Sequence, residues 1–338
     1  MPTIGRLLGL TIIGAALFAG PARSAETAAS IQYELATTPQ GLSDDFRTTE
    51  AADPKFLTLT SIDRNRIDAA WWQPKGKEVA NTTAVIMIHG SGGSYRRAPE
   101  SALGARLAAK GYAVFAIDTR QHNDKINTEN FFDVRRDIDA AVHTARALGY
   151  RKLVLQGHSL GNIQVQFYAA TNWDSDIKAM VLLGPFGNLP WKTRNILVQN
   201  EDNFAKLIAA AKQSLNDGVL DKPLSVRMSY FTEQDVPVTA QHFLTYRWDK
   251  TSIADGTVWI KRIPLPILLV RDQADALIQP FEPYMLLDAA HSEGALAKSI
   301  DYVLLKNDRP PSLKGHYFDG NEQPLADALA QWLSKAGL

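Results

Sequence analysis

Residues Gly157–Gly161, with the sequence GHSLG and Ser159 at its centre, have the residue types and spacing of a nucleophilic serine turn. They follow a predicted strand and lead into a helical segment that starts at Asn162. A sharp strand-to-helix turn lifts the serine oxygen above a sheet, and the flanking glycines let neighbouring backbone pass close. The hydroxyl then lies near a helix amino terminus, which favours an oxyanion. The alternative interpretation is an ordinary turn serine.

A second glycine-rich segment, His89–Gly93 (HGSGG), follows the strand predicted two strands earlier in the chain. A flexible backbone there can direct an amide at an oxyanion, so we assign the amides of Ser91 and Leu160 as the oxyanion hole. A dinucleotide-binding fingerprint would need a third glycine at position 95, which is Tyr95. That interpretation is therefore excluded.

A serine nucleophile needs a general base, and His316 is the best placed of the seven histidines. It stands in a loop between the last predicted strand and the last helix, at the same sheet edge as Ser159. His291 lies inside a predicted helix, Glu282–His291, where a surface position is expected. The remaining histidines are assigned to the two glycine loops (His89, His158), a strand end (His122), a helix (His143) and an insertion (His242).

The acid that orients the base should come from another strand end. The segment Pro266–Asp275 offers Asp275 in the loop beyond the strand, with Asp272 as the reserve, and either could be an ordinary turn residue. The chain order is then Ser159, Asp275, His316. This order is expected when the three groups occupy successive carboxyl ends of one parallel sheet.

The elements that must position these residues alternate between apolar strands and amphipathic helices. Several strands are continuous apolar runs, which is typical of strands buried on both faces. The alternation predicts an α/β fold with a mostly parallel sheet and helices on both faces. The predicted strands are Phe56–Ser61, Asp68–Trp72, Thr83–His89, Ala113–Asp118, Lys152–Gln156, Ala179–Leu183, Ile267–Arg271 and Tyr302–Lys306, after a polar stretch from Glu26 to about Pro54.

The alternation breaks between about Gly187 and Arg262, where the sequence shows helical segments and many aromatic residues but no convincing buried strand. An insertion of this length between two sheet strands predicts a helical cap or lid over the sheet edge, at about 187–262. Most of its aromatic side chains are expected to form the core of the insertion itself.

The amino terminus predicts a secretory signal peptide over residues 1–25, with Arg6 followed by an apolar run and small residues. The apolar run is too short for a membrane-spanning helix. A retained anchor and a buried helix are also compatible with this pattern. Cleavage would leave residues 26–338 as the mature domain, exported to the periplasm or secreted, with no stable membrane span after processing.

Composition excludes several classes of protein. The 338 residues contain 36 basic and 36 acidic side chains, and removal of residues 1–25 leaves a net charge of −2. This balance gives no global attraction for nucleic acid or for an anionic membrane. The absence of Cys excludes disulfides, thiolate metal sites and a cysteine nucleophile. No cofactor and no metal is implied.

Taken together, these segments make the chain resemble the α/β-hydrolase superfamily from about Phe56 to Leu333. The resemblance rests on His89-Gly90, the Gly157–Gly161 turn, Asp275, and Gly315-His316 ahead of the final helix. It implies an α/β-hydrolase fold with a helical cap, similar to capped esterases, lipases and serine aminopeptidase-like members. The chain departs from the common pattern in Asp118–Asn123 (DTRQHN), where many members have Asp-x-Arg-Gly-x-Gly, and at Asn162, where a second glycine is frequent.

The expected activity is cleavage of a carboxylic ester through an acyl-enzyme on Ser159, acting on a small-molecule ester or amide. A serine aminopeptidase or amidase of the same fold would need acidic residues near the cap to hold a free amine. Glu201, Asp202, Glu233 and Asp235 could supply them but have the pattern of solvated surface. An acyltransferase with the same triad and a non-catalytic binding protein are also compatible with the sequence. Oligomeric state and acyl preference are not predicted.

Overall fold

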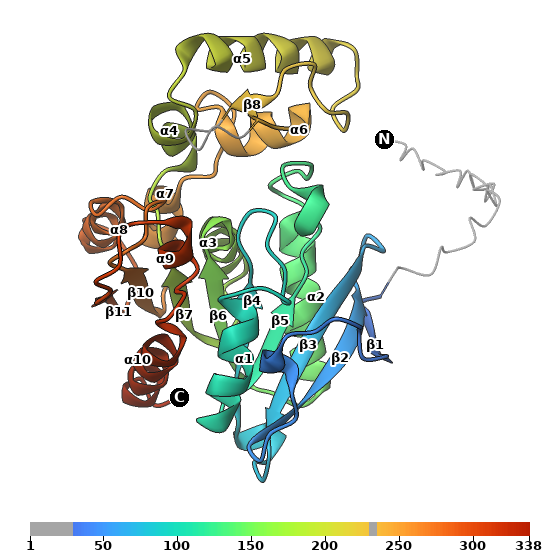
Figure 1. Ribbon diagram of the computed structural model, residues 1–338, viewed down its shortest axis with the longest axis vertical. Helices are drawn as coiled ribbons and strands as arrows, with labels where there is room; N and C mark the ends of the chain where they lie inside the picture. The colour runs from blue at the N-terminus through green and yellow to red at the C-terminus, as the bar shows by residue number, and fades with distance from the viewer. Residues whose placement is uncertain (1–29, 230–234) are drawn as a thin grey trace, which may run out of the picture.

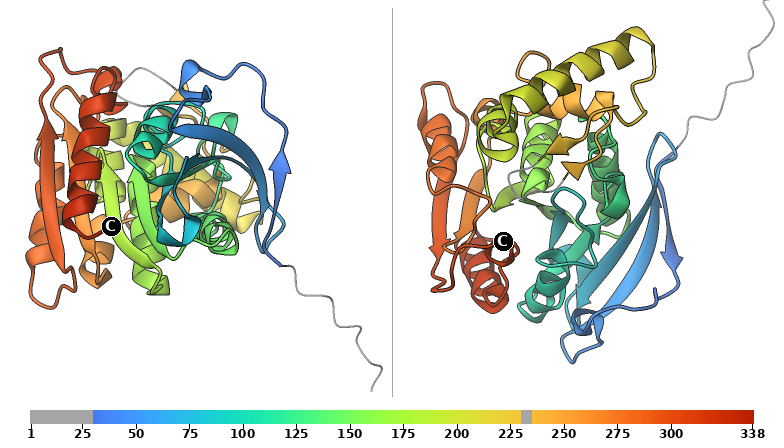
Figure 2. Two further views of the ribbon diagram at one scale, coloured as in Figure 1. Left: turned by 90° about the horizontal axis from the view of Figure 1, so that it is seen from below. Right: turned by 45° about the horizontal axis from the view of Figure 1, so that its top comes forward.

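The computed structural model describes residues 30–229 and 235–338, so the predicted leader and Glu233 lie outside the described residues. The described part is built around a twisted sheet of nine strands in the order β1-β2-β3-β5-β4-β6-β7-β10-β11 (Figures 1 and 2). The strands are β1 Gln32–Ala36, β2 Ala52–Thr60, β3 Arg66–Pro74, β4 Thr83–Ile88, β5 Ala113–Ile117, β6 Lys152–His158, β7 Ile177–Leu183, β10 Pro266–Asp272 and β11 Ser299–Leu305.

The sheet has an antiparallel part and a parallel part. Strands β1, β2, β3 and β5 pair antiparallel, whereas every pair from β5 through β4, β6, β7 and β10 to β11 is parallel. Each of the eight predicted strands overlaps an observed one. The polar stretch from Glu26 to Pro54 was not expected to contain a strand, and this was wrong, because β1 forms there. Four of the five β1 residues are exposed and the strand pairs only with β2, so it carries no apolar run that sequence could reveal.

Helices cover both faces of the sheet, and each face has its own apolar core. Helices α2 Val134–Ala147, α3 Leu160–Asn172 and α8 Glu282–His291 pack on one face, through side chains such as Ile138, Ile163 and Leu286. Helices α1 Glu100–Ala109 and α10 Glu322–Lys335 pack on the other through side chains such as Leu103 and Leu329. Continuous burial of β4 on both faces explains its unbroken apolar sequence.

The segment between β7 and β10 lies over one end of the sheet (Figure 1). Its elements are α4 Leu189–Lys192, the π-helix η4 Thr193–Val198, α5 Glu201–Asn216, the short pair β8 Met228–Ser229 and β9 Asp235–Val236, α6 Ala240–His242, the π-helix η5 Phe243–Arg247, α7 Gly256–Trp259 and the 3₁₀ turn η6 Ile260–Arg262. Phe204 and Phe243 are buried in a separate apolar cluster that belongs to this segment. Tyr246 instead packs in the core of the main sheet, so this segment and the sheet are joined by a common apolar core there.

The remaining short elements lie in connections. They are the 3₁₀ turns η1 Asp44–Phe46, η2 Val79–Asn81 and η3 Asn123–Lys125 and the short helix α9 Leu313–His316. Among the described residues, no helix combines the length and the apolar character that crossing a membrane requires.

Candidate active site

Ser159 lies at a strained turn between β6 and α3. Its backbone has φ 50° and ψ −118°, and its amide donates to the carbonyl of Leu183 on the neighbouring strand over 2.9 Å. The turn is tight enough to exclude side chains at both glycines, since a Cβ on Gly157 would collide with the Gly161 backbone and one on Gly161 with the Ile88 carbonyl. Backbone strain of this kind persists only where the surroundings over-determine it. Because Gly157 and Gly161 allow this close backbone packing, the position of the Ser159 hydroxyl is restricted.

The loop after β4 packs against this turn. A Cβ on Gly90 would lie 2.9 Å from the Cβ of Ser159, so only glycine allows the approach. The ring of His89 holds the loop, with Nδ1 2.7 Å from the Gly90 carbonyl and Nε2 accepting the Thr119 amide over 3.1 Å. Burial lowers the pKa of His89, so the ring is neutral and its proton is on Nδ1. These contacts agree with the assignment of His89 to the glycine-rich loop rather than to the role of general base.

Two amides at this edge have no partner among the described residues. Neither the amide of Ser91 nor that of Leu160 donates to another described group, and both residues border the same cavity as Ser159. The Leu160 amide is the first of α3, where backbone N–H groups are left free by helix geometry. Paired free amides beside a serine are the arrangement that an oxyanion requires.

His316 and Asp275 form a buried pair from two other loops. Nδ1 of His316 lies 2.9 Å from Oδ2 of Asp275, and Oδ1 of Asp275 accepts the amides of Leu277 and Ile278 over 2.8 and 3.0 Å. Burial alone raises the pKa of Asp275, but the imidazole and the two amides outweigh it and hold the pKa below its usual value. The carboxylate is therefore ionised and accepts the Nδ1 proton, which leaves Nε2 of His316 as the basic nitrogen. In the described residues the Ser159 hydroxyl makes no hydrogen bond to it.

Two glycines set the position of this pair. A Cβ on Gly315 would collide with the Ala274 carbonyl, so the helix α9 can approach the Asp275 loop only because residue 315 has no side chain. Gly184, at φ +55°, lies against the imidazole, where a Cβ would be 3.1 Å from Cε1 of His316. Gly315 therefore sets the distance between the two loops, and Gly184 allows the imidazole to lie against the backbone.

His158 forms a hydrogen bond to the backbone of His316, a role that the sequence did not reveal. Its Nε2 lies 3.0 Å from the His316 carbonyl, and burial lowers its pKa to about 3, so the neutral ring donates this bond. Oε1 of Glu100 lies 3.9 Å from the other ring nitrogen and has no hydrogen-bond partner among the described residues. Burial raises the pKa of Glu100 to about 8, which keeps the carboxyl protonated at neutral pH.

The reserve acid, Asp272, accepts hydrogen bonds from groups other than His316. It accepts the Ala274 amide over 2.7 Å and the side-chain amides of Asn307 and Asn321 over 3.1 and 2.8 Å. These contacts join the loops after β10 and β11, and no contact to His316 is among them. The structure thus brings together Ser159, His316 and Asp275 at one sheet edge but does not bring Asp272 to the imidazole.

A cavity of about 180 Å³ opens beside Ser159, between the sheet edge and the segment from α4 to η5. Most of its wall is apolar, and two cations, Lys192 and Arg247, contribute to it. The lining residues are Ser91, Ile126, Ser159, Leu160, Phe186, Leu189, Lys192, Leu197, Arg247, Leu277, Ile278, Leu313 and Tyr317. Within residues 30–229 and 235–338, no group of three or more His, Asp or Glu side chains is arranged to hold a metal ion.

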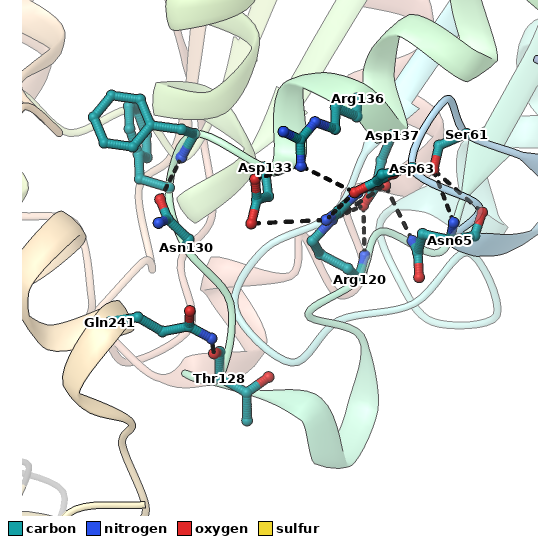
Figure 3. A network of polar contacts seen from close by, with 12 residues as sticks. Ser61, Asp63, Asn65, Arg120, Thr128, Asn130, Asp133, Arg136, Asp137 and Gln241 are labelled. Carbon is teal, nitrogen blue, oxygen red and sulfur yellow. Dashed lines mark hydrogen bonds and ion pairs between the residues drawn. The ribbon is translucent and has the colours of Figure 1, made fainter. Parts of the chain in front are cut away.

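The loop after β5 contains the departure from the common motif and is anchored at both ends (Figure 3). Arg120 bonds Asp137 at 2.7 Å and Asp63 at 3.0 Å, which fixes the start of the loop against α2 and the β2–β3 turn. Farther along, the Thr128 carbonyl accepts the side-chain amide of Gln241 over 2.6 Å. This loop therefore connects the sheet to the segment above it.

Several residues of the site could not be recognised from the sequence alone. Asn162, at the position where glycine is frequent, donates to the carbonyls of Leu183 and Gly184 and so ties α3 to the end of β7. Lys192 and Arg247 lie in a segment where charged residues look like solvated surface. Their burial depends on contacts with distant loops, which only the folded chain reveals.

A family model described as serine aminopeptidase, S33 matches residues 80–302. The chain belongs to this family. It is accordingly a serine hydrolase of the α/β-hydrolase fold, with a mostly parallel sheet and helices on both faces. A comparison with curated protein sequences gives no significant match.

Solved structures of esterases share the fold of this S33 hydrolase. Est1E from Butyrivibrio proteoclasticus with bound ferulic acid is 18% identical with a TM-score of 0.59, over 80% of this chain and 95% of that one. An esterase from Pyrococcus furiosus is 15% identical with a TM-score of 0.58, over 90% and 99%. An acetyl xylan esterase from Paenibacillus sp. R4 is 15% identical with a TM-score of 0.55, over 88% of each chain.

Proposed function

We propose that this S33 hydrolase cleaves carboxylic esters, with Ser159 as nucleophile, His316 as general base and Asp275 as the orienting acid. The observation that carries the proposal is the 2.9 Å contact between His316 Nδ1 and the ionised Asp275, at the same edge as a strained serine turn. This contact sets the imidazole tautomer, so that Nε2 is the nitrogen free to take a proton.

The reaction begins when Nε2 of His316 takes the proton of the Ser159 hydroxyl and the serine oxygen bonds to the ester carbonyl carbon. The carbonyl oxygen becomes an oxyanion, which the free amides of Ser91 and Leu160 stabilise. The imidazolium then gives its proton to the leaving alkoxide as the ester bond breaks. The same imidazole then takes a proton from water as the water oxygen bonds to the acyl carbon. It returns this proton to the Ser159 oxygen as the acyl–serine bond breaks, which releases the acid.

The lining of the cavity supports an ester more than a peptide with a free amino terminus. An aminopeptidase would recognise the cationic amine through acidic side chains, whereas the charged residues of this lining are Lys192 and Arg247. Glu201 and Asp235, two acids considered for that role, are exposed and pair with Arg194 and Ser229. The esterase and aminopeptidase hypotheses separate on hydrolysis of an aminoacyl p-nitroanilide, and an acyltransferase separates on its products when an alcohol is added.

Similarity to esterases adds support of a different kind. Among the similar structures, Est1E has ferulic acid bound, and the Paenibacillus enzyme is an acetyl xylan esterase. At 14% to 18% identity these likenesses establish the fold alone. The choice of acyl group and alcohol follows from the cavity of this chain, since one fold hosts many substrates.

We also propose that the protein is exported. The support is the order of a basic residue, an apolar run and small residues within positions 1–25. Fractionation of cells that produce the full chain, followed by sequencing of the mature amino terminus, tests this. Retention of Met1 in a cytoplasmic protein would contradict it.

The proposed hydrolysis is tested by Ser159→Ala on p-nitrophenyl butyrate. Loss of the nucleophile is expected to lower kcat by about 10⁵-fold or more. Ser175→Ala is the matched control, because Ser175 is exposed and lies outside the cavity lining. Turnover by Ser159→Ala at the rate of the control would contradict the assignment of the nucleophile.

A further inference from the structure

Arg247 is a buried cation on the wall of the cavity that contains Ser159. It ends the π-helix η5 and is only 2% exposed, yet it borders the same space as Ser159 and Leu160. Placing a guanidinium out of contact with water is costly unless its charge is compensated. The partners that surround Arg247 therefore decide what it can do.

The direct partners of Arg247 are all neutral acceptors. Its Nε donates to Nε2 of His242 over 3.2 Å, one terminal nitrogen to Oγ1 of Thr193 over 3.4 Å and the other to Oδ1 of Asn127 over 3.1 Å. Within the described residues, no carboxylate lies within ion-pair distance of it. Lys192 differs, because its ammonium contacts Glu282 at 2.5 Å.

The acid of the cluster, Glu129, reaches Arg247 only across an imidazole. Because Nε2 of His242 accepts from Arg247, the His242 proton is on Nδ1, which lies 3.5 Å from Oε1 of Glu129. Burial lowers the pKa of His242, so the ring is neutral between the two charges. Tyr246 stacks on this ring with centroids 4.3 Å apart. The guanidinium is thus held rigidly, while its charge is compensated at a distance.

Arg247 also keeps hydrogen-bonding capacity. A guanidinium has five N–H donors, and three of them are used by the contacts just described. One N–H remains on each terminal nitrogen. Two such donors on one planar group match the two oxygens of a carboxylate, which arginine binds with bidentate geometry.

We propose that Arg247 binds a free carboxylate of the substrate, so that the preferred ester carries a second, unesterified acid group. This inference rests on the proposed ester hydrolysis at Ser159 and adds the substrate class. The carboxylate belongs either to the acyl part or to the alcohol part, and both give the same contact with Arg247. The cavity that Ser159 and Arg247 both border is mostly apolar, which suits a carbon chain joining the ester to the acid.

The test compares esters matched in length with and without the charge. For the acyl part these are mono-p-nitrophenyl adipate and p-nitrophenyl hexanoate; for the alcohol part, 4-carboxyphenyl butyrate and 4-carbamoylphenyl butyrate. The wild-type protein is expected to prefer one charged ester over its neutral match in kcat/KM. Arg247→Met is expected to lower that preference by about tenfold to a hundredfold. The affected pair tells which part of the substrate carries the acid.

Two further variants keep the test decisive. Arg247→Lys retains the charge without the planar fork, so an intermediate preference is expected. Arg194→Met removes another arginine of the same segment, which pairs with Glu201 on the surface, and is expected to keep the wild-type preference. An unchanged charged-to-neutral ratio in Arg247→Met and Arg247→Lys would overturn the proposal, as would a wild-type protein that prefers both neutral esters.

A binding measurement separates this proposal from the proposed function. Adipate is titrated into the Ser159→Ala protein by calorimetry, with and without Arg247→Lys. Binding that weakens by about tenfold or more with Arg247→Lys supports the carboxylate site even if no ester is hydrolysed. Adipate binding to Ser159→Ala that is independent of residue 247, or absent, together with hydrolysis of the neutral esters by the wild-type protein, overturns the site and leaves the esterase proposal standing.

Discussion

The two sides of the cavity compensate their buried charges in different ways. On the sheet edge, Asp275 touches His316 directly at 2.9 Å and accepts two backbone amides as well. On the opposite wall, Arg247 touches only neutral acceptors, and an imidazole separates it from Glu129. Groups of the protein itself compensate the charge of Asp275, whereas Arg247 keeps two N–H donors unused.

This difference indicates where one fold can vary without loss of chemistry. The sheet edge is assembled from glycines that allow no side chain, such as Gly161 and Gly315, so its geometry is over-determined by backbone packing. The wall with Arg247 comes from an insertion that has an apolar core of its own, although side chains such as Tyr246 also join the core of the main sheet. Catalysis is accordingly assigned to the rigid part and substrate choice to the inserted part.

The largest effect on activity is expected from a change that breaks the contact between Asp275 and His316. Asp275→Asn should lower kcat by about 10⁴-fold, because an amide cannot hold the imidazole in the tautomer that leaves Nε2 basic. Asp272→Asn is the control, since Asp272 bonds Asn307 and Asn321 and not His316. Steady-state kinetics on p-nitrophenyl butyrate, with the melting temperature as a check on folding, measures both. Equal losses in the two variants would contradict the assignment of the orienting acid.

A second change breaks the ion pair between Lys192 and Glu282. Among the described residues, this is the one direct ion pair made by a cation of the cavity lining. Lys192→Met leaves Glu282 buried without its cation, and loss of one member of a buried pair costs about 3 to 5 kcal/mol in the free energy of unfolding. Lys192→Met with Glu282→Gln should recover most of this, because the neutral amide tolerates burial. Urea unfolding compares the two proteins. A double variant no more stable than the single one would show that the ion pair is not the cause.

A third change concerns the buried carboxyl beneath the sheet edge. Burial raises the pKa of Glu100 from 4.5 to about 8 in the folded protein. Between these values the folded state holds a proton that the unfolded chain has released, so the free energy of unfolding decreases as pH rises, by about 1.4 kcal/mol per pH unit. Glu100→Gln should remove this decrease and stabilise the protein by on the order of 2 to 4 kcal/mol at pH 8. Parallel pH profiles of wild type and variant would contradict it.

The smallest effect is expected on the outer surface of the inserted segment. Arg194 pairs with Glu201 at 2.7 Å, but both side chains are exposed, so solvent screens the interaction. Arg194→Ala should leave the melting temperature and the ester kinetics unchanged within error. A marked loss of activity would show that the outer surface of the insertion also contributes to substrate binding.

The sequence was informative wherever a residue type is dictated by its immediate surroundings. The apolar runs of β4 and β6 and the glycines around Ser159 could be read because burial on both faces and close backbone contact restrict what is tolerated locally. The position of His316 and Asp275 followed from the rule that carboxyl ends of parallel strands share an edge.

What the sequence did not reveal depends on contacts between distant segments. Arg247 did not stand out in a polar, aromatic stretch, because its burial comes from Asn127 and Thr193, which are 120 and 54 positions away. His158 was assigned to its own loop, although it supports the backbone of His316, 158 positions on. The edge strand β1 was missed because one partner and an exposed face require no apolar pattern.

Covalent labelling measures whether Ser159 is an activated nucleophile. A fluorophosphonate probe is incubated with the wild-type protein and with Ser159→Ala, and the adduct is located by peptide mass spectrometry. We expect one adduct on Ser159 in the wild-type protein and none in the variant. Equal labelling of the two proteins, or an adduct on another serine, would contradict it.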